Sequence, residues 1–207
     1  MSKNVIIIGA GGHAKVIADI VKKSDDKLIG FLDDNEEVQD KVVFDNKKVI
    51  GKIPDCMNYK NAEFIIGIGN NKVRKIISDK YSNLKWYTAI HPNAVIANEV
   101  IINEGSAIMA GVVINPGTTV GKHCIINTST SIDHDNIIED YVHISPGSHL
   151  AGTVAVKEGT WICSGVTVIN DIIINKNNIV GAGSVVIKNI EEENNTYIGI
   201  PARKIVK

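Results

Sequence analysis

Four histidines in the second half of the chain carry the side chain best suited to moving protons near neutral pH, because the pKa of an imidazole lies near 6.5. They are His123, His134, His143 and His149. Asp135 directly follows His134, and Gly152 stands 18 residues after His134. A histidine beside a glycine whose amide is unobstructed would pair a general base with a donor for an oxyanion.

A second set of chemically suggestive residues lies near the N-terminus. The segment Gly9-Ala10-Gly11-Gly12-His13-Ala14 matches the pattern G-x-G-x-x-A, and two acidic residues, Asp33 and Asp34, follow about 20 positions later. Glycines let a diphosphate approach the backbone, and the free amides of a following helix attract its charge. The segment before residue 92 is short for a full dinucleotide fold, so a mononucleotide or a nucleotide sugar fits better than NAD. A tight turn without a ligand is the other interpretation.

The elements that must position the histidines follow a period of six. Sixteen aliphatic residues recur every sixth position from Ile96 to Val186 without interruption. Neither a helix nor a single strand has this period, which is typical of a hexapeptide-repeat parallel β-helix. Three six-residue units close one triangular coil of 18 residues. We therefore expect His134 and Gly152 at the same corner of neighbouring coils, and all four histidines on corners or outer faces.

Small or β-branched residues stand two positions before most of the aliphatic anchors, where they would share the narrow interior of the prism. Asn136, Ile172 and Asn178 are the exceptions to this pattern.

Residues before position 92 follow a different pattern. Short apolar runs predict buried strands at 5–8, 28–32, 64–68 and 86–90, and apolar residues at helical spacing predict helices at 15–23 and 73–81. The sequence thus predicts a small α/β domain over residues 1–91, with its strand-to-helix turns along one edge of a parallel sheet. A β-helix should occupy residues 92–207, with a C-terminal cap from about residue 190.

The composition of the chain excludes several classes of binding partner. The net charge is -1 and the pI is about 6.6, which gives no electrostatic reason to expect nucleic acid or an anionic membrane as a partner. The sequence has neither a long apolar span nor the pattern of a signal peptide. Three widely spaced cysteines predict reduced thiols, and no cysteine-histidine cluster suggests a metal. We expect a cytoplasmic protein without a metal.

The whole chain resembles the NeuD/PglD family of acetyltransferases. The resemblance is carried by the glycine-rich turn, by F-L-D-D at 31–34, by I-G-N-N at 68–71, and by hexapeptide repeats that end in G-I-P-A-R at 199–203. It implies a left-handed β-helix, a homotrimer with active sites between subunits, and acetyl-CoA as co-substrate. The implied reaction is N-acetylation of the amino group of a nucleotide-linked amino sugar.

The same resemblance assigns roles to individual residues. The catalytic base falls on His134, and its acidic neighbour on Asp135, where the relatives considered carry glutamate. The substrate-binding residues are Gly11, Gly12, His13, Asp33, Asp34, Gly69, Asn70 and Asn71. The resemblance also places His143 at the acetyl-CoA site. The residue spacing adds Gly152 as the oxyanion donor, and it adds Ser164 and Ala182, small corner residues 18 positions apart that would leave a groove for the pantetheine arm. His143 is half a coil from His134, so these two residues would meet only between subunits.

Other functions fit parts of the pattern. O-acetylation of a sialic acid is the main alternative within the same family. A γ-class carbonic anhydrase also uses a β-helix trimer, but with a zinc held by three histidines and without an α/β domain. A non-catalytic sensor of sugar nucleotides would keep the binding residues and lack turnover. A further expectation, drawn from the absence of a nucleophile motif, is direct transfer without an acetyl-enzyme.

Overall fold

The computed structural model describes residues 2–205 of the 207-residue chain. Contacts divide it into two compact units, Met1–Pro92 and Asn93–Lys207. No helix within the described residues is long and apolar enough to cross a bilayer.

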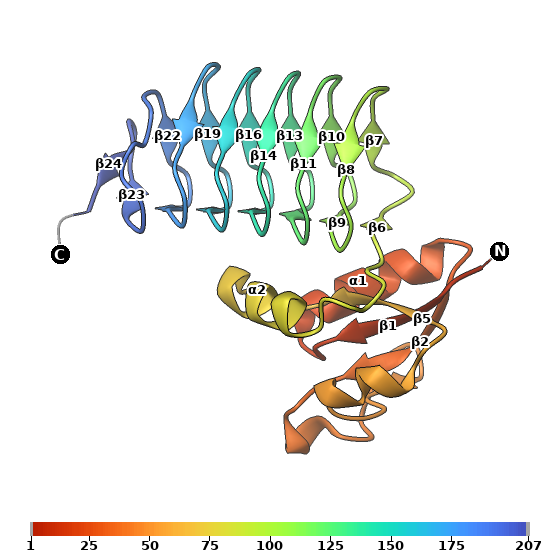
Figure 1. The fold of residues 1–207 in the computed structure, drawn as a ribbon. Coiled ribbons are helices and arrows are strands. Elements are labelled where there is room, and N and C mark those ends of the chain that lie inside the picture. Colours follow the sequence, from red (N-terminus) through yellow and green to blue (C-terminus); the bar gives the residue numbers. More distant parts are fainter. Residues whose placement is uncertain (1, 206–207) are drawn as a thin grey trace. The chain divides into compact units, whose positions relative to one another are not determined.

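The N-terminal unit is built on a parallel sheet of order β2-β1-β5 (Figure 1). Its strands and helices are β1 (Asn4–Ile8), α1 (Gly12–Lys23), β2 (Lys27–Leu32), β3 (Val42–Phe44), β4 (Lys47–Lys48), β5 (Ala62–Ile66), α2 (Asn71–Lys80) and β6 (Ala89–Ile90), with 3-10 turns at Glu36–Val38 and Ile53–Asn58. The four consecutive aliphatic residues that end β1 are fully buried, as expected for a central parallel strand.

Close packing brings the ends of β1 and β5 against α1. A Cβ atom on Gly67, just after β5, would lie 2.8 Å from Cβ of Ala14 in α1 and 2.7 Å from a methyl group of Ile7. Only glycine fits there, and β5 ends at Ile66, two residues earlier than the apolar run predicts. The carboxyl ends of β1, β2 and β5 thereby place the turns that follow them along one edge of the sheet.

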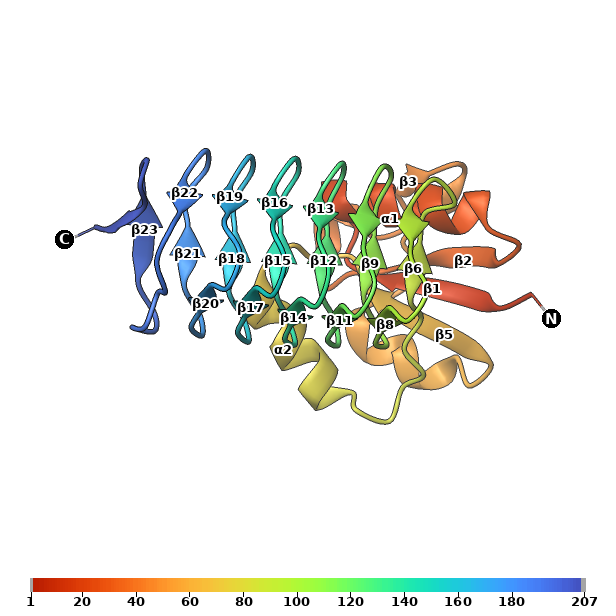
Figure 2. The same cartoon turned by 90° about the horizontal axis from the view of Figure 1, so that it is seen from above.

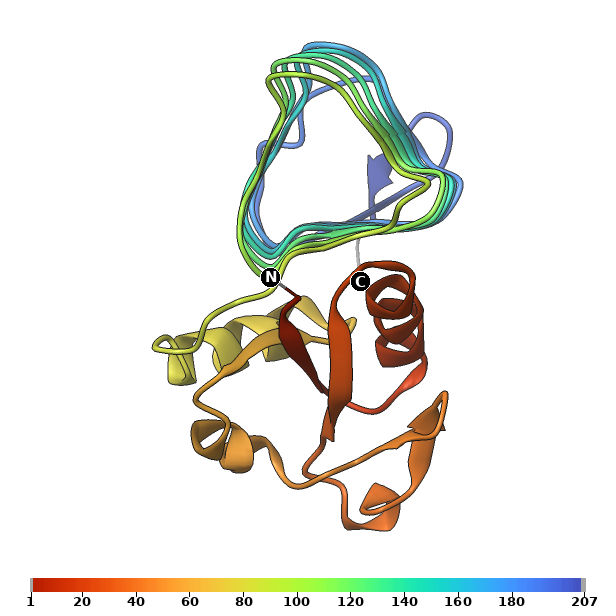
Figure 3. The same ribbon diagram turned by 90° about the vertical axis from the view of Figure 1, so that its right-hand side faces the viewer.

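The second unit is a parallel β-helix whose coils have a triangular section (Figure 3). Its strands line three flat faces, and as far as β22 the strands that are neighbours in a face are parallel and stand 18 residues apart (Figure 2). The first face contains β7 (Val95–Ile96), β10 (Val113–Ile114), β13 (Ser131–Ile132), β16 (His149–Leu150), β19 (Thr167–Val168) and β22 (Val185–Val186). The second face contains β8 (Ile101–Ile102), β11 (Thr119–Val120), β14 (Ile137–Ile138), β17 (Ala155–Val156) and β20 (Ile173–Ile174). The third face contains β9 (Ala107–Ile108), β12 (Ile125–Ile126), β15 (His143–Ile144), β18 (Trp161–Ile162), β21 (Ile179–Val180), β23 (Thr196–Ile198) and β24 (Arg203–Lys204).

The interior explains the repeat. The aliphatic anchors from Ile108 to Val186 are at most 2 % exposed and form one continuous core. The small residues two positions earlier also point inward, and their hydroxyl groups bind backbone carbonyls of the corners, as Thr118 Oγ1 does at Asp133 O (2.9 Å). The fold class is therefore the predicted one, a small α/β domain and a β-helix of hexapeptide repeats.

The C-terminal segment lies on the last coil. β23 pairs in parallel with β21, and β24 returns antiparallel to β23. Backbone hydrogen bonds from Val185 to Gly199 and from Ala202 to Val185 hold it there. Edge groups of the final coil are in this way paired within the chain.

Candidate active site

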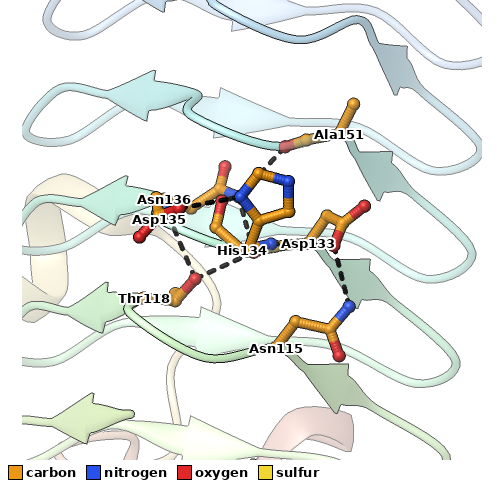
Figure 4. A network of polar contacts seen from close by, with 7 residues as sticks. All are labelled: Asn115, Thr118, Asp133, His134, Asp135, Asn136 and Ala151. Carbon is orange, nitrogen blue, oxygen red and sulfur yellow. Dashed lines mark hydrogen bonds and ion pairs between the residues drawn. The ribbon is translucent and has the colours of Figure 1, made fainter. Parts of the chain in front are cut away.

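His134 and Asp135 form a hydrogen-bonded pair at the corner between the first and second faces. Nδ1 of His134 lies 2.8 Å from Oδ2 of Asp135 (Figure 4). The shorter aspartate side chain thus reaches the imidazole from the next residue, where its backbone adopts a left-handed φ of 57°. More than half of each side chain is exposed, so the pair is open to an approaching ligand.

Two glycines on the neighbouring coils lack the side chains that would otherwise clash with this pair. A Cβ atom on Gly152, one coil after His134, would lie 2.6 Å from Nε2 and Cε1 of the imidazole. A Cβ atom on Gly117, one coil before Asp135, would lie 2.3 Å from Oδ1 of the carboxylate. The structure therefore brings His134, Asp135 and Gly152 together as the sequence predicts, and it adds Gly117. Among the described residues, the N–H of Gly152 donates to no hydrogen bond.

A polar network fixes the backbone beside the pair (Figure 4). Asp133 Oδ1 accepts hydrogen bonds from Nδ2 of Asn115 (2.8 Å) and from the N–H of His134 (2.8 Å). These bonds lower the pKa of Asp133, with the Asn115 amide as the larger cause, because both stabilise the charged carboxylate. Sequence patterns gave Asp133 and Asn115 no role, since they are ordinary outward-facing polar residues until the coils stack.

The environment raises the pKa of His134 above its ordinary value. The main cause is the hydrogen bond to Asp135, with smaller contributions from the charges of Asp133, Asp135 and Asp171, while partial desolvation acts in the opposite direction. An imidazole with a raised pKa is a stronger base, which suits a group that accepts a proton from an attacking nucleophile.

An open groove of about 270 Å³ runs along the first face next to this corner. The residues that line it include Ser131, Asp133, His149, Ala151 and Thr167. Nδ1 of His149 lies 2.8 Å from Oγ of Ser131. His149 is exposed on an outer face, as expected from the sequence, and the structure adds this hydrogen bond and the groove beside it.

His143 lies on the third face, away from the corner that carries His134. Its Nε2 is 3.3 Å from Nδ2 of Asn127, and its ring stacks on Trp161 with centroids 5.8 Å apart. The indole in turn donates to Oγ of Ser145 (2.8 Å). The side chain is only 9 % exposed, so His143 is held in a fixed orientation.

Ser164 and Ala182 stand in one column at the corner between the third and first faces. Each is followed by a glycine with a left-handed φ, Gly165 and Gly183, and one coil earlier Gly147 has the same conformation. A Cβ atom on any of these glycines would meet nothing within 4 Å, whereas at Gly117 it would strike a side chain. The column is therefore an open strip of backbone beside His143's face.

The predicted substrate residues of the N-terminal unit gather at the strand ends. A Cβ atom on Gly11, Gly12 or Gly69 would meet nothing within 4 Å, and none of the three has a left-handed φ. The chain itself thus has no steric need for glycine there. Gly11 caps α1 without a side-chain hydrogen bond, so amides at this helix N-terminus stay available to an anion.

The acidic and amide residues around these glycines brace the turns. Asp33 Oδ2 accepts from the N–H of Ala10 (2.8 Å), and Asp34 Oδ1 accepts from the N–H of Ile53 (2.9 Å). Asn70 caps α2 by accepting from the N–H of Val73 (3.1 Å). These bonds occupy part of each side chain and set the shape of the edge.

Arg74 is the residue at this edge that sequence patterns do not reveal. It is 1 % exposed, and its guanidinium donates to Gly69 O (2.8 Å), Ile68 O (3.3 Å) and Asn71 Oδ1 (3.0 Å). Burial, and secondarily the charge of Arg74, lower the pKa of His13 to about 4. His13 is therefore a neutral imidazole at physiological pH. Nothing in the sequence separates Arg74 from the solvated lysines of the same helix.

Within residues 2–205, no group of three or more His, Cys, Asp or Glu side chains is arranged to hold a metal ion.

Comparison with known proteins places these features in a family. The model of the PglD N-terminal domain matches residues 4–81. Over 121 residues the chain is 41% identical to the UDP-N-acetylbacillosamine N-acetyltransferase of Bacillus subtilis, a match that covers 52% of each protein, so the chain spans about half the length of this curated relative.

Two solved structures match along nearly their whole length. Perosamine N-acetyltransferase from Caulobacter crescentus, as a histidine variant in complex with CoA and GDP-perosamine, is 32% identical with a TM-score of 0.92, and the match covers 99% of this chain and 97% of that one. The acetyltransferase domain of PglB from Neisseria gonorrhoeae, in complex with acetyl coenzyme A, is 30% identical with a TM-score of 0.92. This match covers 99% of this chain and 100% of that one. The chain therefore belongs to the NeuD/PglD-like family of hexapeptide-repeat sugar acetyltransferases.

Proposed function

We propose that this protein is an acetyl-CoA-dependent N-acetyltransferase that acts on the amino group of a nucleotide-linked amino sugar. The observation that carries the proposal is the His134–Asp135 pair, in which Nδ1 lies 2.8 Å from the carboxylate and Nε2 lies over Gly152. The relatives with whole-length structural matches, one bound to CoA and GDP-perosamine and one to acetyl coenzyme A, support this reaction class.

His134 serves as the general base in the proposed mechanism. Asp135 accepts from Nδ1–H, which leaves the lone pair on Nε2 free to take a proton from the attacking amine. The hydrogen bond also stabilises the imidazolium that forms. Once neutral, the sugar amine is itself the nucleophile, so the chain needs no acylated side chain.

The N–H of Gly152 is the proposed donor to the oxyanion, because it has no other acceptor among the described residues. Acetyl-CoA supplies the activated acetyl group and leaves as the thiol. We assign its arm to the open backbone strip at Ser164 and Ala182, with His143 as a polar contact held by Asn127 and Trp161.

The turns of the N-terminal unit are the proposed binding site for the nucleotide sugar. The amides at the start of α1 and the open glycines Gly11, Gly12 and Gly69 suit a diphosphate that approaches the backbone closely. His13 would contact it as a neutral donor or acceptor. Asp33, Asp34, Asn70 and Asn71 would contact the base, the sugar or their flanking groups.

We further propose that the active unit is a homotrimer with sites between subunits. The base lies at one corner of the coil and His143 lies on the opposite face, so the two cannot act on one reacting centre within a single chain. The second face also exposes an apolar row, with Ile101, Ile137 and Ile173 at 57%, 53% and 45% exposure. Rows of this kind mark interaction surfaces.

A thiol-release assay tests the proposal. The purified protein is incubated with acetyl-CoA and a panel of amino sugars linked to UDP, dTDP, GDP or CMP, and the products are identified by mass and by NMR of the acetylated nitrogen. Release of CoA with N-acetylation of at least one nucleotide amino sugar is expected. Transfer only to a hydroxyl of a sialic acid, or release of thiol that does not depend on any acceptor, would refute N-acetylation as the function.

A further inference from the structure

Asn136 is a buried amide inside the prism at the corner that carries His134. Its side chain is 0 % exposed and points inward, where the coil before it carries Thr118 and the coil after it carries Val154. An amide is a poor choice for an apolar interior unless its hydrogen bonds are satisfied. Packing alone therefore does not explain an asparagine at position 136.

One nitrogen of Asn136 holds three backbone carbonyls around the base. The two hydrogens of Nδ2 are shared among Asp133 O (2.7 Å), His134 O (3.1 Å) and Ala151 O (3.0 Å), so one of them is bifurcated between two carbonyls (Figure 4). The first two carbonyls belong to the corner that carries the imidazole. The third belongs to the residue next to Gly152, on the following coil. The amide thus ties together the two coils between which the imidazole lies.

The other end of the same amide has no partner. Among the described residues, Oδ1 of Asn136 accepts no hydrogen bond. Asn178 provides the comparison, because it is an equally buried inward asparagine at another corner. Its Nδ2 donates to Asn175 O (2.8 Å) and Glu192 O (2.6 Å), and its Oδ1 accepts from the N–H of Asn195 (2.9 Å). A buried acceptor without a partner is destabilising, and such departures from good packing are concentrated at functional sites.

We propose that Asn136 is a positioning residue for the acetyl-transfer reaction. It fixes the distance and the angle between the imidazole of His134 and the amide of Gly152 through the carbonyls of residues 133, 134 and 151. This inference rests on the proposed role of His134 as the base. Asn136 itself lies inside the coil and touches no substrate.

The test compares Asn136→Ser with Asn178→Ser, since both remove a buried amide and serine occupies equivalent inward positions at Ser106, Ser148 and Ser184. Thermal unfolding, kcat, both KM values and the pH profile of kcat are measured. Both variants should lower Tm. Only Asn136→Ser should lower kcat, by about tenfold or more, with both KM values within about twofold of the parent. Its acid limb should also move to lower pH, because a displaced imidazole loses the contact with Asp135 that raises its pKa.

A second variant covers the case in which Asn136→Ser does not fold. Asn136→Thr keeps one hydroxyl donor, as Thr118 does at Asp133 O, and should recover part of kcat. Equal kcat in the Asn136→Ser and Asn178→Ser variants would overturn the inference, and so would a failure of both Asn136 variants to fold, which would assign the residue to stability. His134→Ala is run in parallel: if it retains normal turnover, the proposed base is wrong, whereas an inactive His134→Ala beside a normal Asn136→Ser refutes only the positioning role.

Discussion

The carboxylate of Asp135 occupies the space in which a side chain at Gly117 would begin. A Cβ atom at that glycine would lie 2.3 Å from Oδ1, closer than any real contact, and the glycine has a φ of +77°. The two residues are 18 positions apart and stack on neighbouring coils. The acidic partner of His134 can therefore fold back against the corner only because the coil below it carries no side chain there.

Gly117→Ala should separate this effect from general strain. The methyl group would push the Asp135 carboxylate away from Nδ1 of His134, so kcat should fall by about tenfold or more. Gly159→Ala is the matched control, because it also has a left-handed φ (+69°) and its Cβ would strike Oδ1 of Asn177 at 2.4 Å at a different corner. Both variants should lose stability, and steady-state assays should show a fall in kcat only for Gly117→Ala. An equal effect of the two on kcat would contradict the steric role.

His134→Ala should lower kcat by about 10²- to 10⁴-fold, the usual contribution of a general base. Both KM values should change much less, because the imidazole acts in the transition state. Asn170→Ala serves as control, since Asn170 stands two coils later in the same column and also hydrogen-bonds the aspartate that follows it. Single-turnover kinetics with saturating acetyl-CoA make the comparison. Turnover near that of the parent protein would remove His134 from the mechanism.

The β-helix was predictable from sequence because a strict six-residue period leaves few alternatives. An insertion of one residue would turn the inward anchors outward, so the unbroken register from Ile96 to Val186 already determines the fold of that unit. The N-terminal sheet was less sharply defined. The hairpin of β3 and β4 escaped prediction, because its strands are only three and two residues long and give no clear periodic pattern.

The candidate site was predictable only where its residues share a register. His134, Asp135 and Gly152 follow from adjacency and from the 18-residue coil, and the structure brings them together. Asn136 is visible in the sequence only as an exception to the pattern of small inward residues. Arg74 gives no signal at all, because its burial depends on the turn that folds over it.

Asp135→Asn should change the pH dependence of the reaction in a defined direction. The hydrogen bond to Asp135 raises the pKa of His134, so in the parent protein kcat should fall as pH drops through that raised value and the base becomes protonated. The amide stabilises the imidazolium less well, so the acid limb should shift to lower pH while the plateau of kcat also falls. Asp171→Asn, which removes only a more distant charge, should shift the limb less. A limb that stays in place in the Asp135→Asn variant would show that another group controls it.

Gly69→Ala should weaken the binding of the nucleotide sugar without lowering the stability of the protein. Its added Cβ would meet nothing within 4 Å of the chain, and Gly69 has no left-handed φ, so Tm should stay within about a degree of the parent value. Arg74 holds this turn by donating a hydrogen bond to Gly69 O (2.8 Å). If a sugar nucleotide packs against the turn, the added methyl group should obstruct the ligand. KM for the nucleotide sugar should then rise about tenfold, the equivalent of roughly 1.4 kcal/mol of lost binding, while KM for acetyl-CoA stays unchanged. Isothermal titration with each ligand separately measures the same difference, and equal weakening of both ligands would place the nucleotide sugar elsewhere.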